Sequence, residues 1–174
     1  VCSSDLQCAV TSPPYWNLRD YGHGGQLGRE RNPADYIARL VAIMAEVRRV
    51  LRDDGTLWLN LGDTYAAGQL VGIPWQVALA LKSDGWRLRS DLIWHKPCPI
   101  PESVRDRCTR AHEYVFMLAK SRGYKFNAAA IGEPYSDSVG KDRRSMPKAG
   151  AARGSNEGGR MRSAFYQQIG RAHV

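Results

Sequence analysis

Short apolar runs alternate with helical periodicity through the first two thirds of this chain. Compact apolar runs bounded by turn residues indicate buried strands, whereas apolar side chains at helical spacing indicate amphipathic helices. The predicted elements are a strand at 7–11, a helix from Asn32-Pro33 to Asp53-Asp54-Gly55, a strand at 56–61, a helix at 74–83, and strands at 86–94 and 114–119. This order predicts an α/β fold with a mainly parallel sheet and flanking helices.

The first predicted strand ends in an unusual turn. The apolar run QCAVT at residues 7–11 stops at Ser12-Pro13-Pro14, because proline cannot continue a hydrogen-bonded ladder. We expect this strand to be buried. In open α/β sheets, ligands bind outside the carboxyl ends of the strands. The residues that follow this strand are therefore candidates for a functional site.

Charge and composition narrow the class of protein. The chain has 174 residues, a formal charge of +8 and a pI near 9.6, which favours a polyanionic partner such as DNA. No apolar run approaches the length that spans a membrane, and no signal-peptide pattern is present. Four cysteines without repeated spacing are typical of a reducing compartment, so we expect a cytoplasmic protein of bacterial or phage origin.

The two ends of the chain need separate treatment. The hexapeptides VCSSDL at residues 1–6 and IGRAHV at residues 169–174 can be encoded by a common sequencing-library adapter read in its two directions. We interpret both as adapter-derived scars and leave them out of the fold reasoning. The authentic protein would then run from residue 7 to residue 168.

A glycine-rich basic segment occupies residues 137–163. Its seven basic and three acidic residues leave it a net charge of +4, half of the chain's +8. Few large apolar side chains interrupt it, so either phosphate contact or a solvated loop suits its composition. The residues we expect to bind DNA are Lys141, Arg143, Arg144, Lys148 and Arg153.

The tetrapeptide Ser12-Pro13-Pro14-Tyr15 suits chemistry on an exocyclic base amine. Such an amine is a poor nucleophile because its lone pair is delocalised into the ring. Two fixed acceptors, the Ser12 hydroxyl and the Pro13 carbonyl, would draw its two N–H bonds out of plane and localise the lone pair. Tyr15 offers a flat face for a base flipped out of the duplex. An isolated SPPY, by contrast, is more often a simple turn.

The surrounding sequence favours the catalytic interpretation. The tract resembles the [DNS]-P-P-[YFW] motif of the N4-cytosine and N6-adenine DNA methyltransferases. Three segments resemble this family in the expected order: TSPPYWNLRDYG, then GQLGRERNPADYIARLVAIMAEVRRVLRDDGTLWLNLGDTY, then GWRLRSDLIWHKPCPIPESVRDRCTRAHEYVFMLAKS. Together they cover roughly residues 7–134.

The resemblance implies a Rossmann-like methyltransferase sheet, S-adenosyl-L-methionine as cofactor and double-stranded DNA as substrate, with or without a partner restriction endonuclease. Ser12, Pro13, Pro14 and Tyr15 would carry the catalytic role. Asp63 would either help line the cofactor or base pocket or serve as a turn aspartate.

Relatives with the catalytic motif first carry the target-recognition region next and an F-x-G-x-G cofactor motif later still. This chain contains no F-x-G-x-G. We therefore expect residues 7–134 to form the catalytic half, residues 135–168 to begin the basic target-recognition region, and this chain alone to be inactive.

Several alternatives stay open from the sequence. Ser12 favours N4-cytosine over N6-adenine methylation, because an aspartate is commoner at that place in adenine-modifying relatives. Enzymes that methylate a protein glutamine resemble N-P-P-Y, so Ser12 argues against them. A basic DNA-binding fragment without chemistry is the alternative of a different class.

One constellation resembles a metal site. His95, Cys98, Cys108 and His112 have a spacing that superficially suits tetrahedral zinc. However, the flanking residues belong to predicted strands, the loop between them is rich in proline, and the family needs no zinc. We therefore expect no metal.

Overall fold

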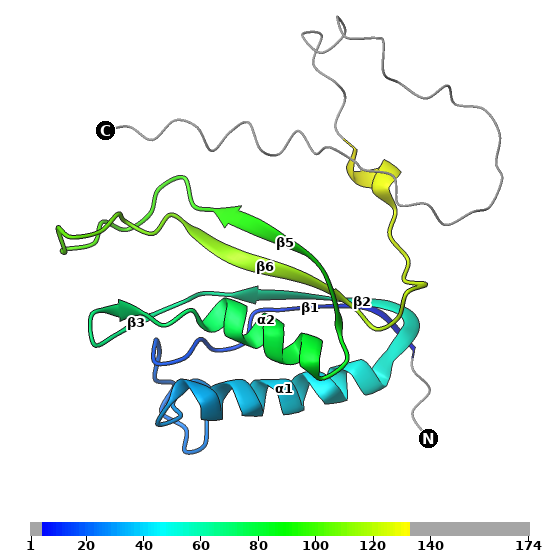
Figure 1. The fold of residues 1–174 in the computed structure, drawn as a ribbon, viewed down its shortest axis with the longest axis horizontal. Coiled ribbons are helices and arrows are strands. Elements are labelled where there is room, and N and C mark those ends of the chain that lie inside the picture. The colour runs from blue at the N-terminus through cyan, green and yellow to red at the C-terminus, as the bar shows by residue number, and fades with distance from the viewer. Residues whose placement is uncertain (1–4, 133–174) are drawn as a thin grey trace, which may run out of the picture. The chain divides into compact units, whose positions relative to one another are not determined.

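A computed structural model describes residues 5–132 of this chain, of which residues 5–130 lie in one compact unit. A four-stranded sheet has the order β1-β2-β6-β5 (Figure 1). Its strands are β1 (Leu6–Thr11), β2 (Leu51–Leu61), β5 (Arg87–His95) and β6 (His112–Ala119). A small hairpin of β3 (Tyr65–Ala66) and β4 (Gln69–Leu70) and a short 3-10 helix, η1 (Ala128–Ile131), complete the elements besides two α-helices.

The strand directions follow from the pairings. β1 is parallel to β2, and β6 is antiparallel to both of its neighbours, β2 and β5. Three strands therefore run one way and β6 runs against them, so the predicted α/β fold with flanking helices is confirmed and its sheet is mixed, with two of the three pairings antiparallel. The antiparallel strand was not predicted, because its direction depends on how the loop at residues 96–111 returns from β5 and not on its own residues.

Helix α1 (Pro33–Val50) begins as the sequence predicts. The Asn32 side chain accepts a 2.9 Å hydrogen bond from the Asp35 backbone N–H, and Pro33 occupies the first helical position. Its end was predicted too late. The helix stops at Val50, and Leu51 already belongs to β2, where it is fully buried and pairs with Leu6. Burial of Leu51 in the sheet outweighs its helical spacing.

Both helices cover one face of the sheet. Helix α2 (Ile73–Ser83) packs beside α1, and the core joins their inner faces to alternate residues of β2 and β6 (Figure 1). The fully buried side chains include Tyr36, Leu40, Leu57, Leu59, Leu61, Val77, Leu81, Phe116 and Leu118. Within residues 5–132, no helix is long and apolar enough to span a bilayer.

The prediction that the first strand is buried was wrong. Val10 is 79% exposed, and Leu6 is 50% exposed. The reason is that β1 forms an edge of the sheet in the part of the chain described: Ala9 packs against the core, whereas Val10, which pairs with Trp58, lies on the face opposite the helices. Trp94 of β5 is likewise 62% exposed. The face opposite the helices is consequently apolar and open.

Candidate active site

The Ser12-Pro13-Pro14-Tyr15 segment lies directly after β1, whose last residue is Thr11. Contacts with α1 and with the loop before it anchor the backbone of this segment. The Tyr36 hydroxyl of α1 donates a 3.0 Å hydrogen bond to the Pro14 carbonyl. The next residue, Trp16, is buried, and its indole N–H donates to the Glu30 carbonyl at 3.0 Å. The position of the segment is thus fixed by packing.

The Tyr15 hydroxyl is the centre of a polar cluster. It donates a 2.8 Å hydrogen bond to Glu113 Oε2 in β6 and accepts one of 3.0 Å from Asn60 Nδ2 in β2. Ser12 Oγ lies 3.1 Å from the same hydroxyl oxygen. Asn60 Nδ2 also donates to Glu113 Oε2 at 2.9 Å. We call these four residues and Lys96, which contacts Glu113, the Glu113 cluster.

Lys96 forms an ion pair with Glu113 and stabilises its negative charge. Its ammonium lies 2.5 Å from Glu113 Oε1, just beyond the end of β5. Burial raises the pKa of Glu113, but hydrogen bonds from Lys96, Asn60 and Tyr15 outweigh it and hold that pKa below its ordinary value. Glu113 is therefore a carboxylate at neutral pH.

Tyr15 is protonated for a related reason. Burial raises the pKa of Tyr15 to about 12, the Ser12 hydrogen bond opposes the rise, and the Glu113 carboxylate adds to it. At neutral pH the cluster thus pairs a neutral phenol with an ionised acid.

Two glycines make room for Tyr15. A Cβ on Gly62, just past β2, would lie 2.5 Å from Cε2 of the Tyr15 ring. A Cβ on Gly28 would lie 2.7 Å from the Tyr15 carbonyl oxygen, and Gly28 also has a φ of +94°. Close approach of backbone to the tyrosine therefore requires glycine at both places.

Ser12 faces a hollow on the open side of the sheet. The side chain is exposed and borders a space of about 480 Å³. The lining residues are Val10, Thr11, Ser12, Trp58, Asn60, Trp94 and Val115. The hollow is apolar apart from its edge near Ser12 and Asn60, so a flat heterocycle with a polar edge suits it.

Comparison with known proteins identifies the family. The family model described as DNA methylase, covering the N6 and N4 enzymes, matches residues 6–171. This chain belongs to the DNA methylase family. It is 48% identical to the type II methyltransferase M.SmaI of Serratia marcescens, over 78% of this chain and 56% of the relative. It is 45% identical to M.XycI of Xanthomonas campestris pv. cyanopsidis, over 83% and 58%.

Solved structures agree on the methyltransferase fold. The cytosine-N4-specific PvuII DNA methyltransferase aligns with a TM-score of 0.61 at 18% identity, over 74% of this chain and 47% of that one. A putative DNA modification methylase from Thermus thermophilus, complexed with S-adenosyl-L-methionine, gives 0.56 at 27%, over 75% and 54%. The chain thus spans a little more than half the length of its first curated relatives.

Asp63 was predicted to lie either in the cofactor or base pocket or in a turn. Its side chain accepts three hydrogen bonds from backbone N–H groups. Its carboxylate accepts from the N–H groups of Thr64 at 2.9 Å, Gly72 at 3.0 Å and Ile73 at 3.0 Å. These bonds tie the end of β2 to the start of α2 and give Asp63 a structural role. A contact with the cofactor stays a prediction.

The expected DNA-binding residues Lys141, Arg143, Arg144, Lys148 and Arg153 lie outside the described residues. In the described part of the chain, no three His, Cys, Asp or Glu side chains gather as a metal site, and Cys8, Cys98 and Cys108 are exposed free thiols.

Sequence reasoning missed Asn60 and Glu113. Each is a polar residue inside an otherwise apolar strand, TLWLNL and HEYVFMLA respectively, and that interruption is the signal that could have marked them. Lys96 follows its strand, but only the fold brings it to Glu113.

Proposed function

We propose that the complete enzyme transfers a methyl group from S-adenosylmethionine to an exocyclic amine of a flipped-out DNA base, namely N4 of cytosine. The observation that carries this proposal is the placement of Ser12. It is an exposed hydrogen-bonding group at the carboxyl end of a parallel strand, and it borders a hollow and is braced through Tyr15. The ordinary turn interpretation of SPPY explains neither the bracing nor the hollow.

The proposed chemistry needs acceptors more than a base. Ser12 Oγ and the Pro13 carbonyl would accept the two N–H bonds of the amine and direct its lone pair toward the incoming methyl group. The Pro14 carbonyl has a different role, because it accepts a hydrogen bond from Tyr36 that anchors the segment to α1. Positioned acceptors act here by preorganisation, which is more effective in a water-poor pocket than in solution.

The described residues suit the base amine, but they offer little to bind the methyl donor. They offer a place for the amine, but Asp63, the acidic residue beside the site, is engaged by three backbone amides. When bound, S-adenosylmethionine supplies the sulfonium methyl group. We propose that its main binding segment belongs to the part of the methyltransferase beyond this chain, so that these 174 residues alone have little or no activity.

Substrate and partners extend the proposal. Ser12 supports cytosine as the target base, because S-P-P-Y resembles the motif of N4-cytosine-specific enzymes more than that of adenine-specific ones. The net charge of +8 supports double-stranded DNA, with the basic segment at residues 137–163 as the phosphate-contacting part. The kinship to type II enzymes supports a bacterial cytoplasmic enzyme that acts with a cognate restriction endonuclease or without one.

Mass spectrometry of DNA exposed to the complete enzyme tests this function. We expect N4-methylcytosine, and Ser12→Ala should lower kcat by about 100-fold or more, the loss typical of removing one preorganised group. N6-methyladenine as the product would overturn the choice of base. Unchanged methylation by Ser12→Ala would overturn the catalytic assignment. DNA binding without methylation by the complete enzyme would favour the non-catalytic alternative.

A further inference from the structure

We propose that Glu113 is a positioning residue that fixes, through Tyr15, the direction of the Ser12 O–H bond, so that Ser12 presents only lone pairs to the substrate amine. The proposal rests on the function proposed above. It follows from counting the hydrogens and lone pairs of the Glu113 cluster.

The Tyr15 oxygen has three polar neighbours but only one hydrogen to donate. That hydrogen is directed to Glu113 Oε2 at 2.8 Å, because a carboxylate can only accept. The other two neighbours, Asn60 Nδ2 at 3.0 Å and Ser12 Oγ at 3.1 Å, must then donate to Tyr15. Geometry alone allows either atom of the Ser12–Tyr15 pair to be the donor, and Glu113 decides between them.

The orientation of the Asn60 amide supports this direction. Its nitrogen faces both Glu113 Oε2 and the Tyr15 oxygen. If the amide were reversed, its carbonyl oxygen would lie against the carboxylate, acceptor to acceptor. The present orientation leaves Asn60 Oδ1 buried without a hydrogen-bond partner among the described residues. Because such an atom carries a free-energy cost, the donating orientation is imposed by Glu113.

The direction persists only while Glu113 is ionised. A protonated acid could donate to Tyr15, and Tyr15 could then turn its hydrogen toward Ser12. Lys96, 2.5 Å from the other carboxylate oxygen, prevents this by stabilising the charge. The Glu113 side chain is only 17% exposed, so water competes poorly for these bonds.

The consequence falls on Ser12. A hydroxyl has one hydrogen and two lone pairs, and here the hydrogen is used by Tyr15. The lone pairs are left for the hollow that Ser12 borders. An amine N–H approaching Ser12 therefore meets an acceptor and never a competing O–H. A serine free to rotate would instead spend part of its time with its hydrogen toward the amine.

Neutron diffraction from deuterated crystals of this chain tests the direction without any need for activity. We expect the Ser12 deuteron on the line to the Tyr15 oxygen and the Tyr15 deuteron on the line to Glu113. A Tyr15 deuteron directed at Ser12 would overturn the proposal. This measurement uses the unaltered sequence, so it does not depend on whether any variant folds.

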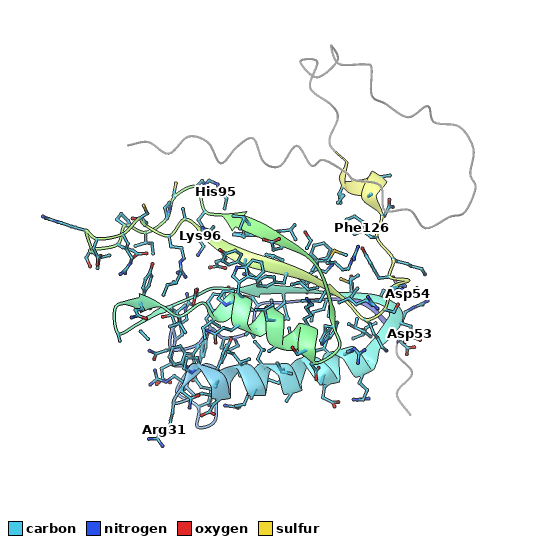
Figure 2. The ribbon with its side chains drawn as sticks, viewed as in Figure 1. Arg31, Asp53, Asp54, His95, Lys96 and Phe126 are labelled. Atoms are coloured by element: carbon cyan, nitrogen blue, oxygen red, sulfur yellow. The ribbon has the colours of Figure 1, made fainter. Side chains whose placement is uncertain are left out.

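Kinetics of the complete enzyme test the consequence. Glu113→Gln puts an amide N–H within reach of Tyr15 and can reverse the chain of donors. We expect kcat to fall about 10-fold to 100-fold, as for a misaligned catalytic group, while KM for DNA changes less than about twofold. The matched control is Asp54→Asn, an ion-paired carboxylate at the opposite end of the sheet, which should leave kcat unchanged (Figure 2).

A double-mutant cycle separates positioning from general structural damage. In a Tyr15→Phe background the hydrogen bonds that link Glu113 to Ser12 are already lost, so Glu113→Gln should change kcat by less than about twofold. An equal fall of kcat in both backgrounds would show that Glu113 does not act through Tyr15. If Ser12→Ala abolishes methylation and Glu113→Gln does not affect kcat, only the positioning proposal fails. If Ser12→Ala has no effect, the proposed function fails first.

Discussion

Two carboxylates at opposite ends of the sheet have similar charges but different surroundings. At the end near His95 and Lys96, Glu113 is 17% exposed and receives hydrogen bonds from Tyr15 and Asn60 as well as from Lys96 (Figure 2). At the other end, Asp54 is 23% exposed, and its side-chain partners among the described residues are two more exposed cations, Arg52 at 43% and Lys125 at 77%. Both acids have a lowered pKa. For Asp54 the cause is Lys125 first and Arg52 second, without neutral donors.

The difference shows what a carboxylate contributes besides charge. Exposed ion pairs contribute little to stability, because water and salt replace either partner easily. Neutral donors around a half-buried acid have a fixed number of hydrogens, so the acid determines which way each of them points. The ion pairs of Asp54 can therefore contribute only a little to stability, whereas Glu113 can fix, through Tyr15, the direction of the Ser12 O–H bond.

The largest contrast is expected from adding one methyl group at Gly62, just past the end of β2, and one at Gly55, within β2. Gly62→Ala places a Cβ 2.5 Å from the Tyr15 ring, which is held in place by its hydroxyl. We expect methylation by the complete enzyme to fall about 100-fold, since the catalytic segment must shift. Gly55→Ala meets the Arg52 carbonyl at 3.0 Å and should affect stability without lowering the activity of the folded enzyme. Initial rates corrected for the folded fraction check both.

A smaller effect is expected where α1 supports the catalytic segment. Tyr36→Phe removes the hydroxyl that donates to the Pro14 carbonyl at 3.0 Å, in a side chain that is fully buried. The free energy of unfolding should fall by about 1 kcal/mol, the typical net contribution of one hydrogen bond, because the bond is only part-buried. Urea denaturation of the 174-residue chain measures it. An unchanged midpoint would mean that the Pro14 carbonyl finds another donor.

These contrasts mark the limit of what the sequence could predict. The start of α1 was predicted correctly because Asn32 and Pro33 act within one turn of the helix. The burial of β1 was predicted wrongly, because an apolar strand does not reveal which of its faces another element covers. Val10 is 79% exposed although its sequence is that of a buried strand.

The site was predictable only in its local part. Ser12 and Tyr15 are three residues apart, and their motif carries a recognisable signature. Glu113 is 98 residues from Tyr15, and Asn60 is 45 residues from it. Their meeting depends on β6 lying antiparallel beside β2, and that pairing follows from packing and chain return, not from the local pattern of either strand.

Alkaline pH should weaken the catalytic end selectively. Burial raises the pKa of Tyr15 to about 12 and raises that of Tyr36 as well, so the folded state prefers both phenols protonated. Below the ordinary tyrosine value this preference is fully satisfied, and it is lost as pH rises from about 10 to about 12, because unfolded tyrosines ionise first.

Allowing for partial exposure, Tyr15 should account for about 1 kcal/mol of that loss. Urea denaturation between these pH values, with and without Tyr15→Phe, measures the difference. A loss of the same size in the Tyr15→Phe protein would assign it to other groups.

The smallest effect is expected at the Asp54 end. Asp54→Asn removes the charge that Arg52 and Lys125 contact, yet water can solvate both cations, so thermal unfolding of this chain should shift less than for Glu113→Gln. Added salt should shrink the Asp54 effect further, because its cations Arg52 and Lys125 are exposed and screened, and should shrink the Glu113 effect less, because that carboxylate is also bonded by Tyr15 and Asn60. Melting curves of the two variants at low and high salt make the comparison. Equal shifts with equal salt dependence would mean that the two carboxylates are equivalent, and the Glu113 cluster would then be an ordinary ion pair beside the catalytic segment.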